Sequence, residues 1–92
     1  MGKNKQILQR VASAVDLPDE PFPGQPLVEI IGTRRVLIEN YRGVIEYGDA
    51  LVRIRVKYGS ITVCGKHLEL TRMTREHLII SGRIDKVELC RG

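Results

Sequence analysis

The chain has 92 residues, of which 42% are apolar and 28% are charged, and its formal net charge is +4. This length supports one domain with a modest core, argues against a large catalytic cleft between domains, and comes with no apolar run long enough for a transmembrane helix. The positive charge fits weak attraction to nucleic acid, to an anionic membrane or to an acidic protein. Two cysteines are too few for a disulfide scaffold, so we expect free thiols.

Residues 1–17 are predicted to form one amphipathic helix, because apolar side chains recur there at helical spacing. Its apolar stripe consists of Ile7, Leu8, Val11, Ala12 and Val15. The stripe is narrow and has no aromatic residue, which favours packing against protein over lying on an anionic membrane. The N-terminal residues are basic but lack the continuous apolar stretch of a secretory signal, so we expect a cytoplasmic protein.

Residues 18–26 contain all four prolines of the chain. Proline removes a backbone donor and disfavours helix in the residue before it, so this segment is predicted to be an extended linker. Such a linker would let the helix reach a partner helix or groove.

From Leu27 onward the apolar period changes to two and glycine-containing turns recur. Residues 27–92 are therefore predicted to form a mainly β domain, a curled antiparallel β-meander of roughly six or seven strands that makes a roll or partial barrel. The five central strands are expected at 34–39, 44–47, 50–57, 60–64 and 67–72. A further strand is expected at 27–31, and one bent strand or two short ones at 77–89.

Four tight turns would give this meander a single register: residues 40–43, 48–49, 58–59 and 65–66. The turn residues are Asn40, Gly43, Gly48, Gly59 and Gly65. In that register Ile38 faces Ile45, Tyr47 joins the same apolar face, and Ile54 faces Val63. The apolar face needs a cover, and we expect curling of the sheet to supply it, with the helix docked loosely or held free.

The opposite face carries a basic stripe of Arg53, Arg55 and Lys57. These charges fit a solvated face with ordinary cross-strand pairs, and they also fit a docking site for an acidic partner. The turn at 40–43 needs only its first and last residues, which leaves Tyr41 and Arg42 exposed without a structural role. The candidate partner-binding residues are therefore Tyr41, Arg42, Arg53, Arg55 and Lys57.

Cys64 and His67 would face each other across the predicted turn at 65–66. A thiol beside an imidazole can be a nucleophile or half of a metal site. With His77 and Cys90 the spacing is C-x2-H-x9-H-x12-C, which lacks the second close pair of small zinc modules. The chain also lacks GxxxxGK[ST], GxGxxG, HExxH and GxSxG, so we expect no enzyme activity, no catalytic residues, no cofactor and no metal.

The motif I-E-N-[HY]-[KR]-G-[VI] matches residues 38–44, and further matches lie at 16–18, 27–32, 59–65 and 80–84. Over nearly its whole length the chain resembles the YabP/YqfC family of sporulation proteins, and the YqfC branch is the more similar. The resemblance implies a non-enzymatic protein made in the mother cell of an endospore-forming bacterium. It further implies a soluble partner of a membrane-anchored sporulation protein at the forespore membrane surface.

These observations predict a structural or assembly factor that binds a protein rather than nucleic acid, through the basic face, a sheet edge or the tethered helix. Its oligomeric state stays open, and a homo-oligomer is compatible with the sequence. The alternative is a small nucleic-acid-binding β-barrel, which the basic charge and short strands favour. Only four aromatic residues are available for base stacking, and this weighs against the alternative.

Overall fold

The computed structural model describes residues 24–92, and the predicted helix and the first part of the linker lie outside the described residues. Six antiparallel strands form one open sheet in the order β1-β2-β6-β5-β4-β3. The strands are β1 (Leu27–Ile31), β2 (Arg35–Glu39), β3 (Gly43–Tyr47), β4 (Leu51–Val56), β5 (Gly59–Met73) and β6 (His77–Arg91). The prediction of a mainly β, antiparallel fold is confirmed. Within residues 24–92 there is no helix long and apolar enough to cross a membrane.

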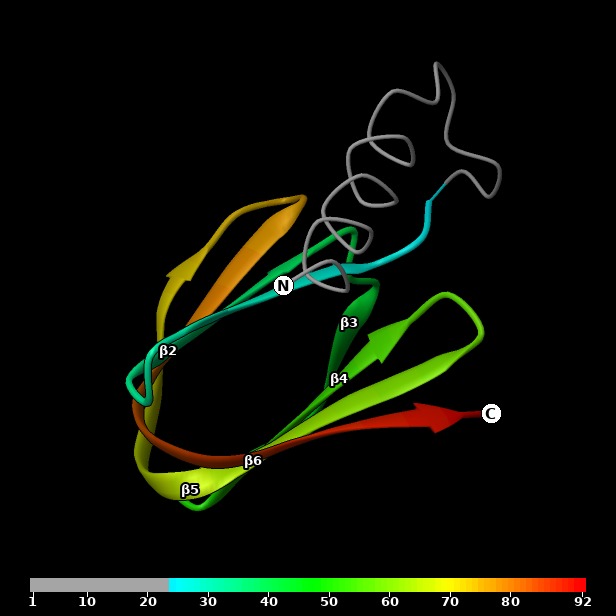
Figure 1. Cartoon of the computed structure of the whole chain (residues 1–92). Coiled ribbons are helices and arrows are strands. Elements are labelled where there is room, and N and C mark those ends of the chain that lie inside the picture. The colour runs from blue at the N-terminus through cyan, green and yellow to red at the C-terminus, as the bar shows by residue number, and fades with distance from the viewer. Residues whose placement is uncertain (1–23) are drawn as a thin grey trace, which may run out of the picture.

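The two longest strands, β5 and β6, fold back sharply at one place, which we call the bend (residues 65–68 of β5 and 82–84 of β6; Figure 1). Two glycines permit this close approach. A Cβ atom on Gly65 would lie 1.8 Å from the carbonyl oxygen of Arg83, and one on Gly82 would lie 2.5 Å from that of His67. Gly82 also has a φ of 139°, which side chains rarely tolerate. Bends of this kind in sheets typically depend on glycine and on irregular register.

The bend divides the sheet into two layers that face each other across one core (Figure 1). The first layer contains β1, β2, residues 77–81 of β6 and residues 69–73 of β5. The second layer contains β3, β4, residues 59–64 of β5 and residues 84–91 of β6. The buried core residues are Val36, Ile38, Val52, Ile54, Val56, Ile61, Val63, Leu68, Leu78, Ile80 and Ile84. The strand order, with β6 between β2 and β5, differs from the predicted meander, because β6 and not β3 pairs with β2.

The predicted turn at residues 40–43 is wrong. β2 pairs with residues 77–81 of β6, not with β3, because the long bent β6 supplies a partner strand for it. Residues 40–42, which we call the crossover, therefore pass from the first layer to the second. The backbone N–H of Asn40 donates to the Glu76 carbonyl oxygen (2.8 Å) and that of Arg42 donates to the Arg55 carbonyl oxygen (2.7 Å). Asn40 has a φ of 61°, a conformation that asparagine tolerates well.

The predicted turn at residues 65–66 is also wrong, because β5 continues through Gly65 as one strand. The predicted strands at 60–64 and 67–72 are two halves of β5. The turn between β4 and β5 is formed by Lys57 and Tyr58, and Gly59 is the first residue of β5. Ile54 consequently pairs with Ile61 instead of Val63. This shift of two residues keeps the same side chains on the core face.

At the connection between β3 and β4 the predicted register is wrong, and this error changes which side chains of β3 face the core. Tyr47 pairs with Val52, and a β-bulge falls between Val44 and Glu46. The extra residue shifts the alternation, so Val44, opposite Ile54, packs against the core, whereas Tyr47, opposite Val52, keeps its predicted face at the exposed edge of the sheet. Ile45 and Tyr47, which were predicted to be in the core, are 43% and 56% exposed. Gly48 lies in the connecting turn as expected, whereas Gly43 begins β3.

Candidate functional site: a basic surface beside the crossover

Tyr41 is not an exposed turn residue. It is half-buried and packs against the core, and its hydroxyl donates a hydrogen bond to the carbonyl oxygen of Thr74. Thr74 lies in the turn between β5 and β6. The side chain therefore ties the crossover to the end of the first layer, which is a structural role that sequence reasoning missed.

Arg42 and Arg55, two of the partner-binding candidates, lie on neighbouring backbone segments. The Arg42 N–H donates to the Arg55 carbonyl oxygen, and Arg55 pairs with Gly43, the residue after Arg42. Both side chains line a shallow depression of about 420 Å³, together with Ile45, Tyr58 and Ser60. The described residues that line it include no acidic side chain. We call this surface the Arg42–Arg55 depression.

Arg53 and Lys57 differ from this pair. The Nη1 atom of Arg53 lies 3.6 Å from a carboxylate oxygen of Glu46, and its Nε donates to the hydroxyl of Thr62 (3.3 Å). The ammonium of Lys57 lies 5.2 Å from the centre of the Tyr58 ring, within range of a cation–π interaction. The predicted basic stripe is thus divided between Arg55, which lines the open depression, and Arg53 and Lys57, which make local contacts.

Two residues of the depression were missed from the sequence. Tyr58 was treated only as a turn residue, although it is 65% exposed at the tip of the β4–β5 turn. An aromatic residue at a turn tip, next to basic strands, was the signal that could have identified it. Ile45 was assigned to the core because no sequence pattern marked the β-bulge.

Cys64 and His67 do not face each other across a turn, because both belong to β5. Cys64 is opposite Leu51 on one side and Lys86 on the other. His77 lies 3.4 Å from a carboxylate oxygen of Glu39, and Cys90 is exposed. Among residues 24–92, no three His, Cys, Asp or Glu side chains are arranged to hold a metal ion.

All six strands lie within the part of the chain that matches a known family of proteins. The family model described as "YabP family" matches residues 24–91. The chain belongs to the YabP family. It is also 26% identical over 88 residues to the "Uncharacterized protein YqfC" of Bacillus subtilis (strain 168), a match that covers 95% of each chain. No solved structure matches. The resemblance seen in the sequence is thereby confirmed.

Proposed function

We propose that this YabP-family protein is a non-enzymatic assembly factor of bacterial endospore formation. It acts as a soluble partner of a membrane-associated sporulation protein, in the mother-cell cytoplasm at the surface of the forespore membrane. The family resemblance supports the process and the type of partner. The Arg42–Arg55 depression supports the mode of binding, since its chemistry suits an acidic segment of another protein.

The pairing of Arg42 and Arg55 is the observation on which the proposal rests. Both arginines line one depression, and within the described residues neither forms an ion pair. A carboxylate can accept two parallel hydrogen bonds from one guanidinium, so an acidic segment would supply the counter-charge that these arginines lack. The exposed side chains of Tyr58 and Ile45 add apolar contact area beside the charges. Arginine and tyrosine are enriched among the residues that dominate protein interfaces.

A nucleic acid would also be attracted by these arginines. Binding of single strands, however, uses open aromatic faces on which bases stack. Tyr41 packs against the core, so its ring is not an open platform, and Tyr58 is the one tyrosine that lines the depression. The geometry thus favours a protein partner over the nucleic-acid alternative.

The test is a double charge reversal, Arg42→Glu with Arg55→Glu, in the native spore-forming host. The matched control is Arg72→Glu with Arg75→Glu, which makes the same charge change at two exposed positions away from the depression. We expect the first variant to lose recovery of a membrane-anchored sporulation protein from sporulating cells and to form roughly tenfold fewer heat-resistant spores, since like charges across an interface cost several kcal/mol. The control should behave as the wild type.

Equal recovery and equal spore counts for the two variants would contradict the proposal. Circular dichroism of both purified proteins checks that the sheet is intact. A gel-shift assay on the wild type addresses the alternative. Binding of single-stranded DNA that weakens steeply with salt and is lost in the Arg42, Arg55 variant would favour the nucleic-acid function instead.

A further inference from the structure

The two layers of the sheet meet along two seams, one joined by hydrogen bonds and the other not paired along most of its length. At the first, which we call the closed seam, β3 and the turn after it lie against β5. The backbone N–H of Leu68 donates to the Asp49 carbonyl oxygen (2.8 Å), and that of Leu70 donates to the Tyr47 hydroxyl (3.4 Å). The second, the open seam, lies between β1 and residues 84–91 of β6, which are not paired with each other.

Apolar side chains of the inner face are exposed along the open seam. Ile30 of β1 is 55% exposed although its neighbour Val36 is fully buried. Leu89 of β6 is 72% exposed although its neighbour Ile61 is 1% exposed. Residues directly opposite each other on paired strands share a face, so Ile30 and Leu89 point to the core side without being covered.

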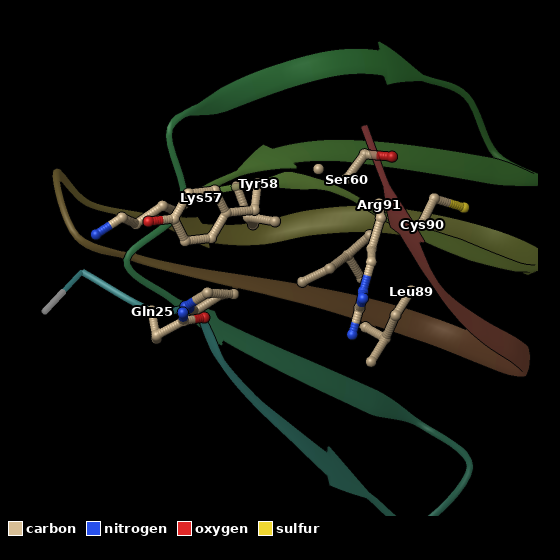
Figure 2. A pocket seen from close by; sticks show the side chains of 11 residues that line it. Gln25, Lys57, Tyr58, Ser60, Leu89, Cys90 and Arg91 are labelled. Atoms are coloured by element: carbon tan, nitrogen blue, oxygen red, sulfur yellow. The ribbon is translucent and has the colours of Figure 1, made fainter. Parts of the chain in front are cut away.

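The open seam ends in a groove of about 400 Å³. Its apolar wall is formed by Pro26, Val56, Ile61 and Leu89. Figure 2 shows Gln25 on one side of this groove, with Leu89 and Arg91 on the other and the Lys57–Tyr58 turn at one end. At its other end the seam is held shut, because the N–H of Ile84 donates to the carbonyl oxygen of Thr33 (2.7 Å). Leu89 is thus exposed within the groove, whereas Ile30 is exposed along the seam without lining the groove.

The N-terminal part of the chain enters the described structure at the rim of this groove. Gln25 and Pro26 both line it, and the Gln25 carbonyl oxygen accepts a hydrogen bond from the side-chain amide of Asn40 (2.9 Å). The described part of the chain therefore begins beside the exposed apolar surface, at a point that is fixed to the sheet.

We propose that residues 4–16 dock in the open seam and place their apolar stripe against Leu89, Ile30 and the groove wall. The predicted helix would be about 20 Å long, and β1, which it would follow, spans about 17 Å. Residues 17–23 reach up to about 23 Å when extended, enough to lay the helix along the seam. The stripe is aliphatic and uncharged, as is the apolar wall that it would cover, while Lys57 and Arg91 also line the groove. Attachment by a short linker gives an effective concentration in the millimolar range, so weak contacts suffice.

The test uses disulfide trapping in the full chain. Cys64 and Cys90 are first replaced by serine, so that only the introduced thiols can form a disulfide. The sulfur of Cys90 points away from Leu89 in Figure 2, so its replacement leaves the surroundings of Leu89 intact. Val11→Cys is then combined with Leu89→Cys. The control combines Gln9→Cys, on the polar face of the predicted helix, with the same Leu89→Cys. We expect an intramolecular disulfide to form roughly tenfold faster, or more, in the Val11 pair.

Equal rates in the two pairs, or no disulfide in either, would overturn the proposal. A covalent dimer on a non-reducing gel would overturn it too, because the stripe of a second copy would then fill the groove. A second measurement leaves the groove unaltered: hydrogen–deuterium exchange of residues 84–91 in Val11→Asp and in Gln9→Asp. We expect faster exchange in Val11→Asp alone, and equal exchange in both would contradict docking. Neither measurement involves Arg42 or Arg55, so this proposal can fail independently of the proposed function.

Discussion

The closed seam and the open seam are built from the same apolar alternation, yet only one of them is sealed. At the closed seam, backbone hydrogen bonds between Leu68 and Asp49 and the reach of Tyr47 toward Leu70 hold the edges together. At the open seam the apolar side chains of Ile30 and Leu89 lie at the edge without a partner strand. The difference shows that alternation decides which side chains face inward, whereas closure depends on where the chain crosses between the layers.

The bend determines both seams, so altering it should have the largest effect. Gly82→Ala places a Cβ 2.5 Å from the His67 carbonyl oxygen at a φ of 139°. Strained φ and overpacking together are expected to destabilise the domain by about 4–5 kcal/mol. Chemical denaturation measures the loss. Gly43→Ala is the matched control, since nothing lies within 4 Å of its added Cβ. Similar stabilities for the two variants would mean that the layers do not depend on this approach.

The change of face at the β-bulge gives a second prediction, with a smaller expected loss of stability. Ile54→Ala removes a fully buried side chain and should cost about 2–4 kcal/mol. Ile45→Ala removes the same atoms from a side chain that is 43% exposed beside the closed seam, and should cost less than about 1 kcal/mol. Thermal and urea denaturation of both variants compare the two sites directly. Comparable losses of stability in the two variants would instead support a register without a bulge, in which Ile45 lies in the core.

The crossover supplies a third prediction, because it links the ends of the two layers. Tyr41→Phe keeps the ring against the core but removes the hydrogen bond to the Thr74 carbonyl oxygen. We expect a loss of about 0.5–1.5 kcal/mol. Arg42→Ala, at the next residue, should change stability by less than about 0.5 kcal/mol, because its side chain is exposed. Equal losses of stability in the two variants would contradict the assignment of a structural role to Tyr41 and a binding role to Arg42.

Much of this fold follows from sequence pattern alone. The core positions of β2, β4 and the first half of β5 were predicted correctly because side chains alternate with a period of two, and a register error of two residues leaves the face unchanged. That is why Ile54 and Val63 were placed correctly in the core although the turn, predicted at residues 58–59, lies at 57–58. The family was also identifiable from short motifs.

Sequence reasoning failed where distant segments decide the structure. Residues 40–43 have the composition of a tight turn, and only the availability of β6 as a partner for β2 makes them a crossover. Gly65 has the signature of a turn, but it serves close contact between two strands. Arg42 and Arg55 were both named from the sequence as candidate binding residues, whereas the burial of Tyr41 was not expected, because its partner Thr74 is 33 residues away. Local patterns carry no information about such contacts.

The smallest expected effect concerns the side chain at the closed seam. Tyr47→Phe removes the hydroxyl that accepts a hydrogen bond from the Leu70 N–H, but that bond is long, at 3.4 Å, and Tyr47 is 56% exposed. Since long, solvent-exposed hydrogen bonds contribute little, we expect a loss of at most about 0.5 kcal/mol. Hydrogen exchange at Leu70 should become faster, while exchange at Leu68, whose N–H donates to a backbone carbonyl, should stay unchanged. If exchange accelerates at both amides, the tyrosine and not the backbone holds this seam shut, and the contrast with the open seam reduces to a single side chain.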